Sequence, residues 1–135
     1  MYNLIKNIAT TNNWIFTYAR KDFMNLFDEE EQLDVPHLFL DPVTVDTIFD
    51  EYNSVESKTY SGSLMVLYSS SIDEEDYDTR YQNYIKPIVS GASATIKSAI
   101  QCDGIYTINN WREVEVINAF DYNLDGIIIT YNINE

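Results

Sequence analysis

An apolar stripe at helical spacing runs through the third quarter of the chain and predicts a long amphipathic helix. Successive members are mostly three or four residues apart, so they share one side of a helix. Pro87 has no backbone N–H and predicts a kink or division near Lys86. Asp103 followed by Gly104 is typical of a helix end. The stripe requires an apolar layer to cover it; its residues are Tyr77, Tyr81, Tyr84, Ile85, Ile88, Ala92, Ile96, Ala99 and Ile100.

Strand patterns before this helix supply such a layer. Residues 14–19 are aromatic and β-branched, and residues 60–69 form a second run of this kind. Residues 37–40 and 43–49 are also apolar, and Pro42 separates them at a position that only a sheet edge or bulge tolerates. The chain before the helix therefore contributes several strands.

The last third of the chain predicts a β-hairpin. Residues 111–120 alternate in part, and residues 127–133 place Ile127, Ile129, Tyr131 and Ile133 on one face. Turn residues lie between the two runs, namely Asn123, Asp125 and Gly126.

These patterns together predict one α+β domain over residues 1–135. It has a mostly antiparallel sheet, a short N-terminal helix over residues 1–11, one long helix kinked near Lys86, and the C-terminal β-hairpin. Residues 53–58 are polar and predict a connection. Gly62 indicates a bulge or a close approach of two backbones.

Acidic residues dominate the charge of the 135-residue chain. There are 22 Asp and Glu against eight Lys and Arg, which gives a formal net charge of −14 and a pI near 4.1. Between Lys21 and Lys58 lie eleven acids and no Lys or Arg, and residues 73–78 hold a second acidic cluster. This charge excludes nucleic-acid binding through the general surface, and an anionic membrane repels it. Three interpretations of the acidic surface stay open: solubility, contact with basic partners, or the lining of a passage for DNA.

The residues that carry catalysis are scarce. His37 is the single histidine and Cys102 the single cysteine, and the nucleotide-binding, zinc-protease and Cys-x-x-Cys motifs are absent from the sequence. His37 stands beside Pro36 in an apolar run, which favours a packing or interface role. We therefore predict no catalytic, cofactor-binding or metal-binding residues, and we do not expect an enzyme.

One segment resembles the opening of a calcium loop. Residues 121–126 read Asp-Tyr-Asn-Leu-Asp-Gly, but the twelfth loop position, which needs a bidentate glutamate, is Asn132. The flanks also have strand patterns, whereas a calcium loop of this class lies between helices. A hairpin turn is the favoured interpretation.

Tyrosine is unusually frequent and indicates contact surfaces. The chain has 11 tyrosines, a residue type enriched at protein interfaces. Tyr52, Tyr106 and Tyr122 lie near predicted loops and are the interface candidates.

Several stretches, taken in order, resemble a group of small virion proteins from tailed phages of Bacteroidetes-type hosts. The order of elements also resembles tail-terminator and head–tail connector subunits. The resemblance implies a virion protein without catalytic residues, one that forms an oligomeric ring around the DNA channel between portal and tail. The stretches are Phe39-Leu40-Asp41-Pro42, residues 59–65 (TYSGSLM), residues 71–77 (SIDEEDY), and residue 120 to the C-terminus, which begins FDYNLDGI.

This resemblance leads to one hypothesis and two alternatives. As a ring subunit, the chain is expected to contact its own copies and neighbouring portal, connector or tail subunits while DNA passes without specific binding. Residues 22–57, free of Lys and Arg, are then the candidate lumen or partner surface, and the edge of the final hairpin is a candidate ring contact. The first alternative is an acidic inhibitor that mimics DNA and binds a basic host protein. The second is a small enzyme with a scattered site.

Overall fold

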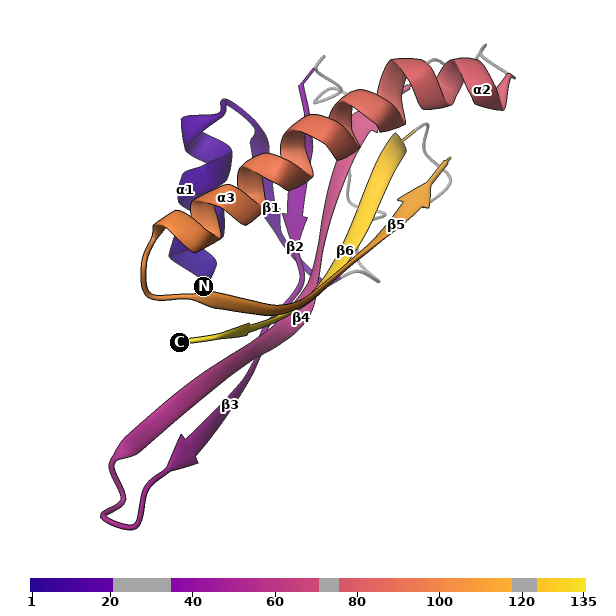
Figure 1. The fold of residues 1–135 in the computed structure, drawn as a ribbon. Helices are drawn as coiled ribbons and strands as arrows, with labels where there is room; N and C mark the ends of the chain where they lie inside the picture. Colours follow the sequence, from indigo (N-terminus) through magenta and orange to yellow (C-terminus); the bar gives the residue numbers. More distant parts are fainter. Residues whose placement is uncertain (21–34, 71–75, 118–123) are drawn as a thin grey trace.

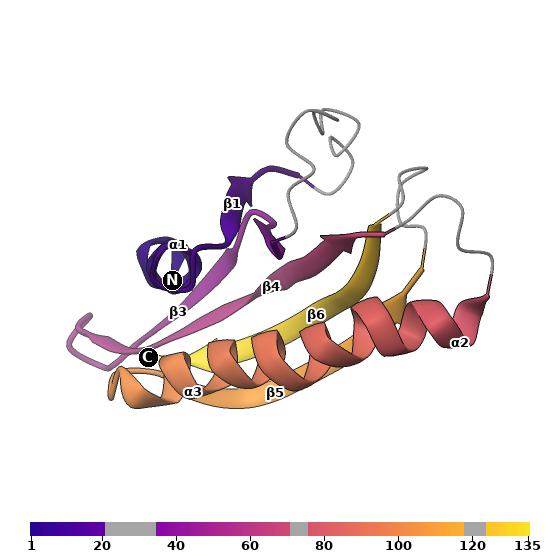
Figure 2. The ribbon, with the colours of Figure 1, turned by 90° about the horizontal axis from the view of Figure 1, so that it is seen from above.

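The computed structural model describes residues 1–20, 35–70, 76–117 and 124–135. These residues form one mixed sheet of six strands with the helices on one face (Figures 1 and 2). The expectation of an α+β fold is confirmed. The strand order is β1-β2-β4-β6-β5, and β3 pairs with β4 outside this path. The strands are β1 (Ile15–Tyr18), β2 (His37–Leu40), β3 (Thr44–Phe49), β4 (Val55–Ser69), β5 (Thr107–Val116) and β6 (Leu124–Asn134).

Strand β4 organises the sheet. On one side it pairs antiparallel with β6 from Thr59 to Ser69, and on the other side with β2 and β3 in succession. β5 pairs antiparallel with β6, whereas β1 and β2 are parallel. The predicted alternation in β6 is confirmed, because its odd-numbered residues from Ile127 to Ile133 are buried on the face that the helices cover.

The N-terminal helix α1 (Tyr2–Thr11) matches the expected helix over residues 1–11. It buries Ile5, Ile8 and Ala9, whose spacing places them on one side of the helix. Asn13 lies at φ 57°, a left-handed conformation that asparagine adopts more readily than most residues, and it turns the chain directly into β1.

The expectation of one long helix is wrong. The helical region consists of four short segments. They follow one another without a break along one path across the sheet (Figure 1). Two of them are π-helical, with i→i+5 hydrogen bonds. Pro87 gives the physical reason, since it has no N–H to donate to the preceding turn. The segments are α2 (Tyr77–Arg80), the π-helices η3 (Tyr81–Ile85) and η4 (Ile88–Ser93), and α3 (Ala94–Cys102).

Two further predictions fail at the strands. Residues 53–58 are not only a connection, because β4 already begins at Val55. Asp125 and Gly126 are not turn residues, because they lie in β6. A Cβ on Gly126 would lie 2.1 Å from the carbonyl oxygen of Val66, so this glycine permits close packing of strands. Asn123, the third expected turn residue, lies outside the described residues.

The main core lies between the helices and one face of the sheet. Ile88, Ile96 and Ile100 of the helical segments pack against this face together with α1. A smaller apolar cluster lies on the opposite face and contains Phe39, Met65, Leu67 and Leu124. Among the described helices, none is long and apolar enough to cross a membrane.

Candidate functional site

A two-stranded ribbon extends from the body of the sheet. It consists of residues 44–58, that is β3, the turn, and the first residues of β4 (Figure 1). β6 reaches only to Thr59 in its pairing with β4, followed by a hydrogen bond from the Glu135 N–H to the Lys58 carbonyl oxygen at 2.8 Å. From Lys58 toward the tip of the ribbon, β3 is the only strand that pairs with β4 among the described residues.

Aromatic and polar contacts hold the base of the ribbon. The rings of Tyr60 and Tyr106 meet edge to face at 5.9 Å. The Tyr60 hydroxyl donates a hydrogen bond to Glu135, and this bond raises the pKa of Tyr60 to about 12, with smaller contributions from burial and from the Glu135 charge. Lys58 Nζ lies 3.8 Å from Glu135 Oε2. The C-terminal residue therefore ties the ribbon to the body.

Asp50 shapes the turn at the tip of the ribbon. Its Oδ1 accepts hydrogen bonds from the N–H groups of Tyr52 and Ser54, both at 2.8 Å. Asn53 adopts φ 58°, a left-handed conformation that asparagine tolerates. The tip has a defined shape although it projects into solvent.

Large apolar side chains are exposed along the ribbon. They account for five of the eleven exposed large hydrophobic side chains of the described residues, so the ribbon holds a disproportionate share. Among them only Tyr52 is one of the individual residues predicted for an interface, because apolar residues in a short strand are equally typical of a core. The five, with their exposed fractions, are Val45 49%, Ile48 55%, Phe49 57%, Tyr52 79% and Val55 52%.

The acidic stretch expected over residues 22–57 falls partly on this ribbon. Asp46, Glu51 and Glu56 are exposed there, while residues 22–34 lie outside the described part of the chain. In the second cluster, residues 73–75 also lie outside it. Asp76 caps α2, since its Oδ2 accepts from Thr79 N at 2.9 Å and from Thr79 Oγ1 at 2.6 Å. These hydrogen bonds lower the pKa of Asp76, so this carboxylate has a structural role.

The open edge of β5 is the second candidate surface. Within the described residues, β5 has a neighbouring strand on the β6 side only, and β1 ends the sheet at the opposite edge. Val114 on β5 is 46% exposed. β5, which covers most of the first strand of the expected C-terminal hairpin, is therefore an outer strand of the described sheet.

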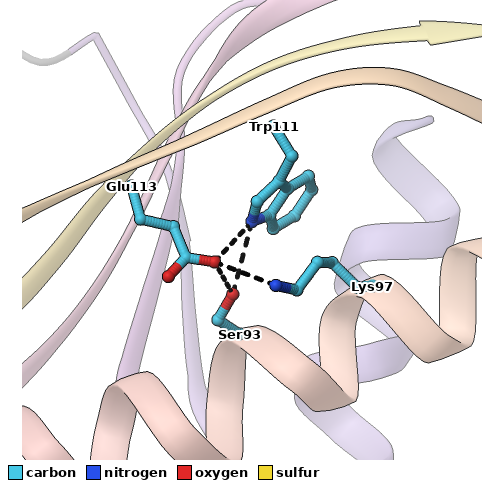
Figure 3. A network of polar contacts seen from close by, with 4 residues as sticks. All are labelled: Ser93, Lys97, Trp111 and Glu113. Atoms are coloured by element: carbon cyan, nitrogen blue, oxygen red, sulfur yellow. Dashed lines mark hydrogen bonds and ion pairs between the residues drawn. The ribbon is translucent and has the colours of Figure 1, made fainter.

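A polar network joins the helical region to β5 beneath this edge (Figure 3). Glu113 accepts hydrogen bonds from Ser93, from Trp111 Nε1 at 2.7 Å and from Lys97 Nζ at 3.2 Å. Burial raises the pKa of Glu113, but these hydrogen bonds and the Lys97 charge outweigh it, so the pKa lies below its ordinary value. Ser93 is 1% exposed, which closes its hydroxyl to a substrate. The network fixes η4 and α3 on the sheet.

In residues 121–126, the segment that resembles a calcium loop, the described carboxylate is not available to bind a metal ion. Asp125 is fully buried, and its Oδ2 lies 3.1 Å from Arg80 Nε. Asp121 and Asn123 lie outside the described residues. Over the described ranges, no group of three or more His, Cys, Asp or Glu side chains is placed to hold a metal.

His37 and Cys102 occupy very different environments. His37 is 1% exposed in β2, and its ring stacks on Phe39 at 6.2 Å. This burial agrees with the expected packing role. Cys102 ends α3 and is exposed.

The three tyrosines that were candidates for an interface have separate outcomes. Tyr52 is the most exposed large apolar side chain of the described residues, at 79%. Tyr106 is half-buried against Tyr60 at the base of the ribbon. Tyr122 lies outside the described residues.

A shallow groove of about 590 Å³ lies where the ribbon joins the sheet. Asp41, Pro42 and Gly62 line it, together with Tyr131, whose hydroxyl is buried and has no hydrogen-bond partner among the described residues. Burial, with the Asp41 charge, raises the pKa of Tyr131. The absence of a side chain on Gly62 leaves room for this hydroxyl, because a Cβ there would lie 3.1 Å from it. The neighbour of Gly62 is therefore a side chain, and the expected close approach of two backbones is not what this glycine accommodates, since the nearest backbone atom, Val43 Cα, would lie at an ordinary 3.7 Å.

Comparisons with known proteins assign no activity. No family model matches the chain. An uncharacterized protein of Plasmodium falciparum (isolate 3D7) is 30% identical over 78 residues, which are 57% of this chain and 3% of that protein. The chain thus spans a small fraction of that relative's length. The ribbon and the β5 edge remain the features on which a function can be argued.

Proposed function

We propose that the protein is a structural subunit of a tailed-phage virion that forms an oligomeric ring at the head–tail junction or in the tail. The observation that carries the proposal is the projecting ribbon with its exposed apolar side chains. An isolated two-stranded ribbon is marginally stable in water, and exposed apolar patches mark interaction sites. The resemblance of the sequence to small phage virion proteins supports the same role.

The two sheet edges provide a route to a closed ring. A ring needs head-to-tail contacts in which two different patches on each subunit match. β5 and β1 end the described sheet on opposite sides, so backbone pairing between β5 of one copy and a second edge of the next would satisfy both strands. This contact would be the expected role of the hairpin edge.

The charge suits a channel for DNA. Phosphate contacts from Lys and Arg would hold DNA by releasing counterions, and a net charge of −14 disfavours them. The proposed subunit acts within the virion by binding its own copies and neighbouring portal, connector or tail subunits. It requires neither catalysis nor a cofactor.

The alternative function is an acidic inhibitor that mimics DNA and occupies a basic groove of a host protein. The observation that favours it is the group of exposed acids on the ribbon, Asp46, Glu51 and Glu56. Such a mimic would act as a monomer or dimer, whereas a ring subunit is present in many copies in the particle.

The first experiment is quantitative mass spectrometry of purified particles from the source of the protein. Many copies per particle, on the order of a closed ring, support the proposal. Absence from the particle overturns it and favours the inhibitor.

A second experiment tests the ring contact with purified protein. Val114→Lys places a charge on the β5 edge, and we expect self-association to fall about tenfold by analytical ultracentrifugation. Ile105→Lys is the matched control, since Ile105 is 59% exposed but lies before the strand. Equal effects of the two variants contradict a contact through β5.

A further inference from the structure

The ribbon has one predominantly apolar face. Cross-strand pairing puts Val45 opposite Tyr60 and Phe49 opposite Val55, and paired residues share a face of the ribbon. Val45, Phe49 and Val55 are each about half exposed, at 49%, 57% and 52%. Together with Tyr52 at the tip, this face presents apolar area that the described part of the fold leaves in solvent.

The ribbon that carries this apolar face is acidic as a whole. Residues 44–58 contain Asp46, Asp50, Glu51 and Glu56 against the single base Lys58, which is itself 3.8 Å from Glu135. A surface that covers the ribbon therefore has to combine apolar contact with positive charge, because a neutral or acidic cover would desolvate or repel these carboxylates.

A second copy of this chain lacks such a surface over the described residues. Of its seven described Lys and Arg residues, Arg80 is buried against Asp125, and Lys58 and Lys97 form ion pairs with Glu135 and Glu113. The other four are dispersed: Lys6 on α1, Arg20 after β1, Lys86 between the two π-helices, and Arg112 on β5. The net charge of −14 adds repulsion between copies.

We infer that the ribbon docks on a different protein, one whose receiving surface is apolar and rimmed by lysine or arginine side chains. This inference rests on the proposed function only in treating the ribbon as an interaction surface. In the proposed virion, the ring closes through the sheet edges, and the ribbon joins the ring to a neighbouring component of basic character. Among the described residues β3 pairs only with β4, so its other edge would allow the partner to add a strand.

The test uses purified full-length protein and fluorescent peptides of about ten residues as probes. One peptide alternates leucine with lysine, a second alternates serine with lysine, and a third alternates leucine with glutamate. Binding is followed by fluorescence anisotropy. We expect the leucine–lysine peptide to bind at least about tenfold more tightly than either control peptide, and binding to weaken as salt is raised from about 50 to 300 mM.

Matched variants locate the binding. The double variant Val45→Thr with Phe49→Thr keeps the charge and retains strand-forming residues. We expect it to lower the affinity for the leucine–lysine peptide about tenfold. Val114→Thr is the control on β5 and is expected to leave this affinity unchanged. Circular dichroism checks that both variants stay folded.

Three results overturn the inference. The first is equal affinity of the serine–lysine and leucine–lysine peptides, which would indicate general charge attraction. The second is equal affinity of the ribbon variant and the Val114→Thr variant. The third is loss of self-association in the ribbon variant by analytical ultracentrifugation, which would make a second copy the occupant. If Val114→Lys loses self-association but still binds the leucine–lysine peptide, the result supports both proposals. If the protein is absent from the particles but binds this peptide, the result removes the proposed function alone.

Discussion

Arg80 and Asp125 form an ion pair that solvent does not reach. Arg80 Nε lies 3.1 Å from Asp125 Oδ2, and the two side chains are 4% and 0% exposed. Arg80 Nη2 also donates a hydrogen bond to Ser70 Oγ at 2.9 Å. The pair links α2 to the beginning of β6, so it fixes one end of the helical region on the sheet.

Removing one member of this pair should be costly. We expect Arg80→Ala to lower the free energy of unfolding by roughly 3–5 kcal/mol, because it leaves the Asp125 carboxylate buried without its cation. Urea unfolding measures the loss. The double variant Arg80→Met with Asp125→Leu removes both charges and should recover most of it. A single-variant loss below about 1 kcal/mol would contradict a buried pair.

Glu113 should make the attachment of the helical region to β5 depend on pH. Its pKa lies below the ordinary 4.5, since the hydrogen bonds from Ser93, Trp111 and Lys97 outweigh burial. A lowered pKa stabilises the fold above the unfolded-state value and loses that effect as pH falls through the folded-state value. We expect Glu113→Gln to be less stable than the wild type at neutral pH and to approach the stability of the wild type as acid protonates Glu113.

Thermal unfolding from neutral to acidic pH checks the prediction for Glu113. The control is Glu115→Gln, an exposed carboxylate on the same strand. A Glu113→Gln deficit that stays constant as the pH is lowered would show that the carboxylate charge is not responsible.

Two glycines should respond oppositely to alanine. In Gly126→Ala the new methyl group would meet the Val66 carbonyl oxygen, with 2.1 Å between them before any shift, so we expect a loss of at least about 1–3 kcal/mol. Gly91 lies in η4, and a Cβ there meets nothing within 4 Å. Gly91→Ala should therefore gain about 0.5–1 kcal/mol from helix propensity. Chemical denaturation distinguishes them, and similar values for both variants would refute the close strand approach.

Asp50 should control the order of the ribbon tip without controlling the stability of the whole domain. Asp50→Ala removes the acceptor of the Tyr52 and Ser54 N–H groups, so we expect faster hydrogen exchange at these amides and a nearly unchanged melting temperature. Glu51→Ala removes the same charge and serves as the control. Unchanged exchange in Asp50→Ala would mean that the tip is shaped by the strands alone.

Local sequence patterns predicted the helices and strands whose buried residues recur at a regular spacing. The alternation from Ile127 to Ile133 identified the buried side of β6, and the short first helix was expected over residues 1–11. The stripe from Tyr77 to Ile100 correctly marked a helical region, but it did not reveal the π-helical segments around Pro87. Periodicity records which residues face a core and not which hydrogen-bond ladder holds them.

Long-range pairing accounts for the predictions that failed. The polar residues from Val55 to Lys58 form a strand because β3 lies beside them, and Gly126 lies in a strand because Val66 approaches its backbone. The exposed apolar face of the ribbon escaped prediction for a related reason. An apolar strand residue is buried or exposed according to what lies beside it in space.

Residue identity and short-range spacing account for the acidic charge, the α+β composition and the absence of familiar catalytic motifs. The three-dimensional arrangement of the strands was needed to see that β3 and the start of β4 leave the sheet as a ribbon and that β5 is an outer strand of the described sheet. The tertiary structure also pairs Arg80 with Asp125 and Glu113 with Lys97. These relationships join residues distant in the chain, and they depend on strand order and on how the helices cross the sheet, which no local pattern encodes.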